Sequence, residues 1–200
     1  MAPEPLRVGI TGGIGSGKTF VSKIFEFLGI PVYYADARAK WLQENDSVLV
    51  QQIQQVFGPQ AYDATGRLNR TFLANEIFSS DAKRKIINDV VHPRVAEDYR
   101  RWVQQRRHFP YTLKEAALLF ETNAHQKLTL IINVNAPEAT RIGRVLQRDP
   151  QRSPQQVQQI IAQQLDDTER SRRADHSIDN SGETLVLPQV LTLHHHLVNH

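Results

Sequence analysis

The chain has 200 residues, a formal net charge of +3, 40% hydrophobic residues and 22% charged residues, a composition typical of folded globular proteins. No stretch approaches the roughly 20 apolar residues that a membrane-spanning helix requires, and no cysteine is present for a disulfide or a thiolate metal site. Met1–Pro5 is too short and too polar to be a secretory signal. We therefore expect one cytoplasmic domain that does not interact with membranes.

The first predicted element is an apolar strand over Leu6–Thr11. It leads into Gly12–Thr19, whose sequence GGIGSGKT fits the pattern G-x-x-x-x-G-K-[ST]. Apolar residues then recur at helical spacing from Phe20 to Leu28. The motif thus stands between a strand and a helix, which is the context of a phosphate-binding loop.

The residue types of this loop indicate what each position does. Its glycines allow successive backbone N–H groups to turn toward an anion, and the positive end of the following helix adds to that cradle. Lys18 is expected to reach the β- and γ-phosphates of a nucleotide, and the Thr19 hydroxyl is a candidate Mg²⁺ ligand. The candidate N–H donors belong to Gly13, Ile14, Gly15, Ser16, Gly17, Lys18 and Thr19.

A short second strand is predicted over Val32–Tyr34, and Asp36 follows it. A carboxylate just past a strand end can accept a proton from an attacking hydroxyl or orient that hydroxyl. Asp36 is equally suited to cap a helix over Ala37–Glu44. Its position alone leaves both roles open.

The middle of the chain is predicted to be helical, with a polar loop over Tyr62–Asn69. Asp63–Gly66 matches the D-x-x-G of GTPases, but it lies in turn sequence and no N-K-x-D occurs elsewhere, so we reject that match. His92 precedes a proline and therefore predicts a helix break, where this histidine is either structural or faces a cleft. The predicted helices are Asp46–Phe57, Thr71–Ser79, Asp81–Val91 and Pro93–Arg107.

Positive charge gathers between Lys83 and Arg107, where eight Lys or Arg residues face three acidic ones. This stretch is a solvated helix face, a nucleic-acid patch, or the rim of a pocket for a polyanionic small molecule. Nucleic acid is the least supported of the three, because no recognition fold or aromatic platform accompanies the charge.

The second half returns to strands, predicted over Tyr111–Leu119, Leu128–Val134 and Asp175–Asn180. Glu121, after the first of these, is either a contact near the site or a surface charge. A terminal helix carries the run His194–His196, which we interpret as helix surface rather than a metal site.

Two further helices are predicted between the last two strands. The helix Pro137–Arg148 places Arg141, Arg144 and Arg148 on one face. Ser153 starts a capping box that launches a helix to about Asp166. This pair is either a lid that closes over phosphates or an ordinary exposed hairpin.

These fragments together resemble the dephospho-CoA kinase family over nearly the whole chain. The family's T-G-G-I-G-S-G-K-S/T opening is present as Thr11–Thr19, and its G-I-P-V as Gly29–Val32. Two residues depart from the family pattern, because Tyr34 replaces the first acid of D-A-D and Ala117 the proline of P-L-L-F-E. The other matching fragments are Ala35-Asp36, Gly66–Arg70, His92-Pro93, Ala117–Glu121, Arg144–Asp149, Ala162–Gln164 and Ala174–Asn180.

The resemblance implies an α/β P-loop fold like that of nucleoside monophosphate kinases, with a parallel β-sheet core flanked by helices. It implies a single kinase domain over 1–200, with a core of about 1–45, 111–140 and 174–200, a helical CoA-binding region of about 46–110 and a lid of about 141–173. The basic stretch would fall in the CoA-binding region, which favours the pocket-rim interpretation for some of its members.

The resemblance also implies Mg²⁺-dependent transfer of the γ-phosphoryl group of ATP to the ribose 3′-hydroxyl of dephospho-CoA. Asp36 would be the base or orienter of that hydroxyl, and Arg144 the lid arginine on the migrating group. Arg148 and Asn180 would contact the nucleotide, and Thr11 and His92 would lie near the acceptor. The partners would be ATP and dephospho-CoA, with no nucleic acid, and the protein a monomer or weak homo-oligomer.

Two other functions stay open at this point. A kinase of another small alcohol or nucleotide would share the same core and lid. A GTP switch protein belongs to a different class, and the missing N-K-x-D already argues against it.

Overall fold

The computed structural model describes residues 4–78 and 80–199, so Ser79, the last residue of one predicted helix, lies outside the described residues. Its chain divides into two compact units, one comprising residues 1–34 and 103–200 and the other residues 35–102.

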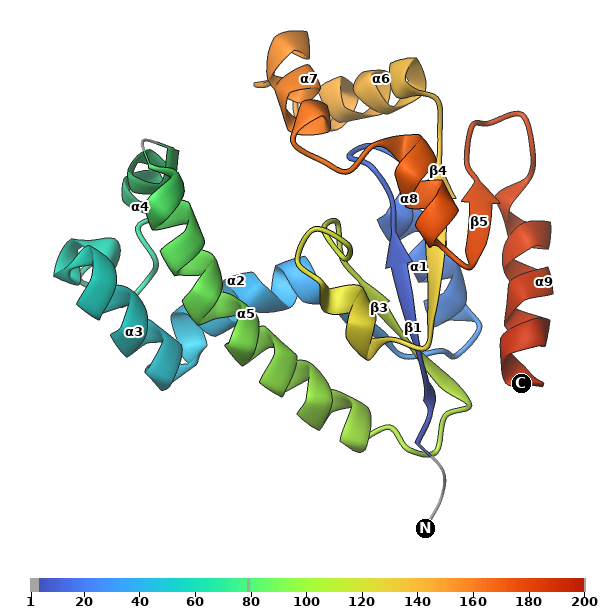
Figure 1. Cartoon of the computed structure of the whole chain (residues 1–200), viewed down its shortest axis with the longest axis horizontal. Coiled ribbons are helices and arrows are strands. Elements are labelled where there is room, and N and C mark those ends of the chain that lie inside the picture. Colours follow the sequence, from blue (N-terminus) through green and yellow to red (C-terminus); the bar gives the residue numbers. More distant parts are fainter. Residues whose placement is uncertain (1–3, 79, 200) are drawn as a thin grey trace. The chain divides into compact units, whose positions relative to one another are not determined.

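The first unit is built on a five-stranded sheet in the order β2-β3-β1-β4-β5, and every strand pair in it is parallel. β1 lies at the centre, where Val8 and Ile10 are fully buried between β3 and β4 (Figure 1). The α/β fold class predicted from the sequence is therefore confirmed. The strands are β1 (Leu6–Thr11), β2 (Val32–Tyr34), β3 (Tyr111–Glu115), β4 (Leu130–Asn135) and β5 (His176–Asp179).

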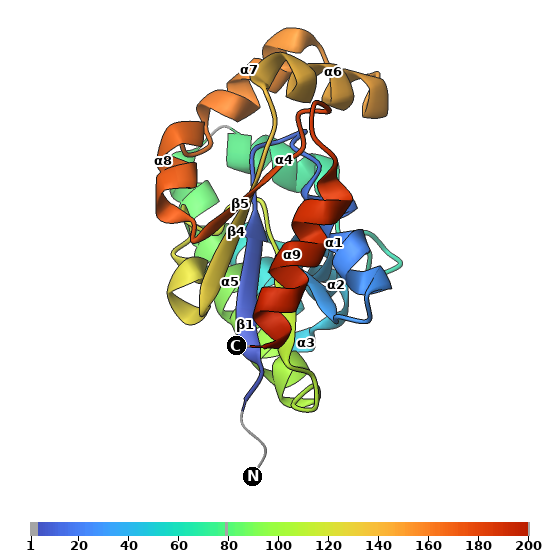
Figure 2. The ribbon, with the colours of Figure 1, turned by 90° about the vertical axis from the view of Figure 1, so that its right-hand side faces the viewer.

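Helices α1 (Lys18–Phe27) and α9 (Val186–Val198) pack side by side over one face of this sheet (Figure 2). Phe25 of α1 and Val190 of α9 belong to the same buried cluster as the sheet residues, so burial of apolar surface stabilises the layer. The remaining elements of the unit are η2 (Ala124–Lys127), α6 (Glu138–Arg148), α7 (Pro154–Ala162) and α8 (Asp167–Arg173).

The second unit is helical. Its core includes the fully buried Leu49 and Ile53 of α3. Asp46 caps α3 by accepting the Leu49 N–H at 2.9 Å, and the same carboxylate pairs with Arg94 at 2.5 Å. The unit contains α2 (Ala35–Asn45), α3 (Ser47–Phe57), η1 (Pro59–Ala61), α4 (Arg70–Phe78) and most of α5 (Asp81–Gln104).

The predicted break at His92-Pro93 is wrong, because α5 runs uninterrupted from Asp81 to Gln104 with Pro93 inside it. Val91, Val95 and Tyr99 are buried at four-residue spacing on one face across the proline. The free energy gained by burying them outweighs two costs of Pro93: the missing backbone N–H removes one helical hydrogen bond, and the residue before a proline disfavours the helical conformation.

The largest of the other boundary differences, about four residues each, are at the ends of β3 and α7. β3 ends at Glu115 rather than Leu119, since the next residues form turns. α7 ends at Ala162 rather than near Asp166, because the Asp166 side chain accepts the Thr168 and Glu169 N–H groups and so starts α8. The predicted capping box at Ser153 is confirmed, with both reciprocal hydrogen bonds present.

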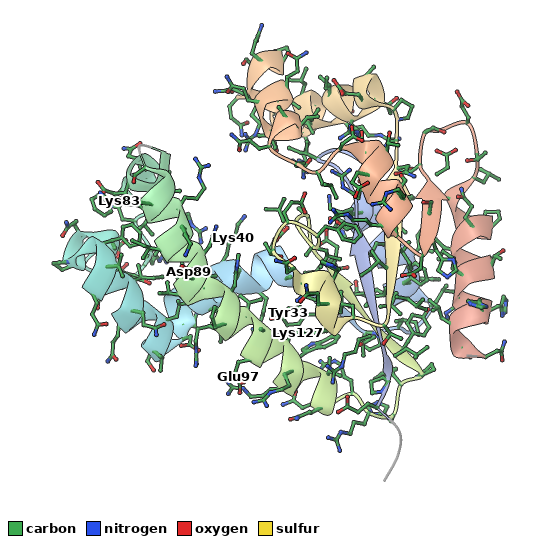
Figure 3. The ribbon with its side chains drawn as sticks, in the orientation of Figure 1. Tyr33, Lys40, Lys83, Asp89, Glu97 and Lys127 are labelled. Atoms are coloured by element: carbon green, nitrogen blue, oxygen red, sulfur yellow. The ribbon has the colours of Figure 1, made fainter. Side chains whose placement is uncertain are left out.

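The basic stretch of α5 is largely paired within its own unit. Lys83 forms an ion pair with Glu76, Lys85 pairs with Asp89 at 2.9 Å, and Figure 3 shows Lys83, Asp89 and Glu97 along the same helix. Glu97 holds Arg100 at 2.7 Å. Much of the positive charge is thus balanced locally, as expected of a solvated helix face. Within the described residues, no helix combines the length and the apolar character needed to cross a bilayer.

Candidate active site

The loop between β1 and α1 has the backbone conformation that its glycines permit. Gly15 has φ 78° and Gly17 has φ 91°, both in the left-handed region that side chains with a Cβ disfavour. A Cβ at Gly15 would lie 2.4 Å from the Arg141 carbonyl oxygen, and one at Gly17 would lie 2.1 Å from Asn180 Nδ2. The backbone angle favours glycine at both positions, and at Gly15 the close Arg141 backbone excludes a side chain as well.

Lys18, at the first position of α1, is buried with its ammonium group against the loop. Its Nζ donates to the carbonyl oxygens of Gly12 at 2.9 Å and Gly13 at 3.2 Å. The adjacent Thr19 is exposed, and its hydroxyl is a hard oxygen ligand in the first turn of the helix. Such a hydroxyl fits Mg²⁺, which takes oxygen ligands and keeps most of its coordination for water and substrate phosphates.

Two carboxamide side chains from other parts of the first unit form hydrogen bonds with the backbone of the loop. Asn180, directly after β5, donates from Nδ2 to the Ser16 carbonyl oxygen at 2.7 Å. Gln164, after α7, accepts the Ile14 N–H at its Oε1 at 2.8 Å. The conformation of the loop is thus set by residues far from it in sequence as well as by its glycines.

Arginines from α6 and α8 line the same loop. The Arg141 side chain is buried, and a Cβ placed on Gly13 would lie 2.2 Å from its Nη1. Arg141 pairs with Asp167, whose other oxygen lies 2.5 Å from Nη1 of the equally buried Arg170. Because these two buried guanidinium groups share one carboxylate, the three side chains beside Gly13 carry a net positive charge. This charge suits a phosphate group.

The other two arginines of α6 differ in their surroundings. Arg144 has a buried Nη1 with no hydrogen-bond partner among the described residues. Arg148 is exposed, and its Nη2 lies 2.8 Å from Asp149 Oδ2. Hydrogen bonding from Arg148 holds the pKa of the Asp149 carboxyl below its usual value. The three arginines predicted to share one face of this helix therefore differ in their contacts. Arg141 lies against the loop, Arg144 has a buried donor without a partner among the described residues, and Arg148 pairs with Asp149.

Thr11, at the end of β1, is buried, and its hydroxyl lies 3.5 Å from the Ala117 carbonyl oxygen. Asp36 and His92 belong to the second unit. α2 begins at Ala35, so Asp36 lies exposed inside the first turn rather than at the cap position that was its alternative role. His92 lies within α5 rather than at a helix junction.

A separate pocket of about 400 Å³ opens where β4 and β5 end beside α8. Three carboxylates, from Asp167, Asp179 and Glu183, line it, and no residue of Gly12–Thr19 does. The negative charge of these carboxylates makes this pocket less suited to a phosphate group than the loop.

The histidine run lies on α9. The His194 Nδ1 lies 2.8 Å from the Tyr111 hydroxyl, and the His196 ring packs against His176. Burial, with a further effect of His195, lowers the pKa of His194. No group of three His, Asp or Glu side chains within residues 4–78 and 80–199 is arranged to hold a metal ion.

Comparison with known proteins agrees with this geometry. A family model described as dephospho-CoA kinase matches residues 6–185. The chain belongs to the dephospho-CoA kinase family. It is 36% identical over 188 residues to the dephospho-CoA kinase of Bacteroides fragilis, covering 94% of this chain and 91% of that protein. It is 37% identical over 194 residues to that of Acinetobacter baylyi, covering 96% of this chain and 98% of the relative.

Solved structures agree in fold. A crystal structure of a Thermus thermophilus protein matches with a TM-score of 0.86 and 31% identity, covering 97% of this chain and 98% of that one. A dephospho-CoA kinase from Campylobacter jejuni matches with a TM-score of 0.72 at 20% identity, covering 96% and 97% of the two chains. The fold is therefore that of the P-loop kinases related to nucleoside monophosphate kinases, as the sequence resemblance implied.

The two departures from the family pattern have local explanations in the structure. The Tyr34 hydroxyl donates to Glu26 Oε2 at 3.2 Å, and burial together with Glu26 raises the pKa of Tyr34 to about 12. Tyr34 therefore stays neutral and is bound to α1. Ala117 offers its carbonyl group to Thr11, a contact that its side chain does not affect.

Glu121, whose role the sequence left open, accepts the Leu165 N–H at 2.9 Å and so holds the segment after α7. Sequence reasoning missed the roles of Gln164, Asp167 and Arg170 at the loop. The family's A-Q fragment includes Gln164 without indicating a function for it. Asp167 and Arg170 carried no signal for the loop, because Arg141, which shares the Asp167 carboxylate with Arg170, lies far from them in sequence.

Proposed function

We propose that this chain, as a member of its family, transfers the γ-phosphoryl group of ATP to the ribose 3′-hydroxyl of dephospho-CoA, giving CoA and ADP. The observation that carries the proposal is the phosphate loop, with a buried Lys18 at the start of α1 and a family match that spans residues 6–185. Phosphoryl transfer of this kind depends on positioning and on neutralising charge.

The loop supplies the binding side of this chemistry. Backbone N–H groups of the loop Gly13–Thr19, other than that of Ile14, and the positive end of α1 hold the phosphates, and Lys18 exchanges its loop carbonyls for the β- and γ-phosphates. The Thr19 hydroxyl would hold Mg²⁺, which would neutralise phosphate charge during the transfer. Asn180 acts through the Ser16 carbonyl, and Arg148 contacts the nucleotide after release from Asp149.

The reacting groups are assigned from the family motif. Asp36, exposed in the first turn of α2, accepts the proton of the 3′-hydroxyl or orients it for in-line attack. Arg144 stabilises the charge of the migrating phosphoryl group, and its buried, unpartnered Nη1 supports this role, because such a donor is costly unless a ligand uses it.

The acceptor is held by Thr11, His92 and residues of the helical region 46–110, while residues 141–173 act as the lid over a core of 1–45, 111–140 and 174–200. The contacts group residues 35–45 with the helical unit. This division, a monomeric or weakly associating protein, and a cytoplasmic location without nucleic-acid partners remain predictions.

A coupled assay of ADP release tests the proposal. Dephospho-CoA is offered beside pantetheine, adenosine and common nucleoside monophosphates, each with ATP and Mg²⁺. We expect release with dephospho-CoA to exceed that with every other acceptor. A preference for another alcohol would assign the chain to a different kinase activity. In a parallel assay of phosphate release without any acceptor, faster hydrolysis of GTP than of ATP would indicate a switch protein.

A further inference from the structure

The four residues 164–167, between the end of α7 and the start of α8, are fixed at every position. Gln164 Oε1 accepts the Ile14 N–H at 2.8 Å, and the Leu165 N–H donates to Glu121 Oε1 at 2.9 Å. The Leu165 carbonyl oxygen accepts a hydrogen bond from Arg170. Asp166 caps α8, and Asp167 joins Arg170 to Arg141. The segment is therefore a rigid support beside the phosphate loop.

Gln164 is the member of this support that bonds directly to the loop backbone. The Ile14 N–H is committed to Gln164, and the Ser16 N–H donates to the Gly13 carbonyl oxygen at 3.1 Å, so phosphate depends on the other N–H groups of the loop. A peptide in a glycine-rich loop rotates easily, and one hydrogen bond to a fixed acceptor removes much of that freedom. Holding the peptide between Gly13 and Ile14 helps to set the direction of the next N–H groups.

We propose that Gln164 is a positioning residue for the phosphate loop, acting through the Ile14 N–H. It keeps the cradle in its binding conformation and ties it to the end of α7, so nucleotide affinity depends on a side chain that lies 150 residues away in sequence. The proposal rests on the kinase function proposed above. Its first test needs no activity, so the two can fail separately.

The first measurement is amide hydrogen exchange of Ile14 in the protein alone, for the native chain and for Gln164→Met. Methionine keeps a similar length and removes the carboxamide oxygen. We expect exchange of the Ile14 amide to quicken by about 2- to 10-fold, the range for losing one hydrogen bond. The matched control is Gln163→Met, because Gln163 is an exposed neighbour on the same segment. An unchanged rate in Gln164→Met would overturn the proposal.

The second measurement separates positioning from a purely structural role. In Gln164→Met we expect the KM for ATP to rise by roughly 2- to 10-fold relative to Gln163→Met, with the KM for dephospho-CoA unchanged. Faster Ile14 exchange with the same KM for ATP as the control would mean that the bond stabilises the loop without serving nucleotide binding, and would overturn the proposal.

Gln164→Glu keeps the test decisive if the methionine variant fails to fold. The carboxylate still accepts the Ile14 N–H but places a negative charge beside the phosphates. We expect Ile14 exchange to stay slow, while the KM for ATP rises and then recovers as the pH is lowered toward the usual glutamate pKa of about 4.3. A KM for ATP equal to that of the native chain at neutral pH would contradict the placement of Gln164 beside the bound nucleotide.

Discussion

Asn180 and Ser16, 164 residues apart in sequence, are joined by a hydrogen bond of 2.7 Å from the Asn180 Nδ2 to the Ser16 carbonyl oxygen. Asn180 follows β5 at the edge of the sheet, and Ser16 lies in the phosphate loop after the central β1. The loop is therefore attached to β1 by the chain itself and to β5 by this hydrogen bond. In this way the sheet helps to set the direction of the N–H groups of the loop.

Replacing the donor of this bond is the first prediction. Asn180→Asp has nearly the same size but sets a carboxylate oxygen against the Ser16 carbonyl and adds a negative charge near the phosphates. We expect the KM for ATP to rise by about 10- to 100-fold, in line with loss of a hydrogen bond and addition of a like charge. Asn199→Asp, on the exposed end of α9, is the control and should leave the KM unchanged. An unaltered KM in Asn180→Asp would show that this contact is not needed for binding.

Gly17→Ala tests the loop backbone itself. The left-handed φ of 91° and the Asn180 amide 2.1 Å from a new Cβ both oppose alanine here. We expect loss of ATP binding by titration calorimetry. Gly143→Ala is the matched control, because Gly143 lies inside α6 with nothing within 4 Å of a Cβ. That variant should gain up to about 1 kcal/mol of stability from helix propensity. Native-like ATP affinity in Gly17→Ala would be inconsistent with the loop geometry described.

Much of the first unit could be predicted from sequence, because apolar strands and a helix at regular spacing flank a motif whose residue types fix its chemistry. β1 and β2 have the predicted bounds, and Lys18 lies in the loop. α5 differed from the prediction because burial of Val91 and Val95, a tertiary effect, overrides the local preference set by Pro93. The contacts of Gln164 and Asn180 with the loop join residues distant in sequence, and no local pattern encodes such pairs.

Asp36→Asn should lower kcat by about 10²- to 10⁴-fold, the usual range for a lost general base or orienting carboxylate, with ATP affinity little changed. Single-turnover kinetics with saturating ATP measures this step. Asp89→Asn, an exposed acid of α5 paired with Lys85, is the control. If kcat were unchanged, Asp36 would have no part in the mechanism.

Arg144→Ala should lower kcat by up to about 10³- to 10⁵-fold if Arg144 stabilises transition-state charge, as arginines do in related phosphoryl transfers. Arg144→Lys should recover part of the rate, since it restores the charge without the planar fork. Arg172→Ala, which removes an exposed arginine paired with Glu169, should leave kcat unaffected. A fall in ATP affinity alone would make Arg144 a binding residue.

Stability should fall in mild acid because of His194. Burial lowers its pKa in the folded protein, so the unfolded chain binds the proton more tightly. The contribution of His194 is fully present above the unfolded value of about 6.5 and is lost as the pH falls below it. Thermal unfolding of the native chain and of His194→Phe across this range measures the difference. Equal pH slopes for the two proteins would exclude His194 as the cause.

The central claim is that dephospho-CoA receives the γ-phosphoryl group on its ribose 3′-hydroxyl. The most direct measurement follows ATP labelled in its γ-phosphate and identifies the labelled product by mass spectrometry and phosphorus NMR. The account predicts that the label appears as a 3′-phosphate on CoA in amounts equal to the ADP formed. Label found only in inorganic phosphate, or at another position of the acceptor, would contradict it.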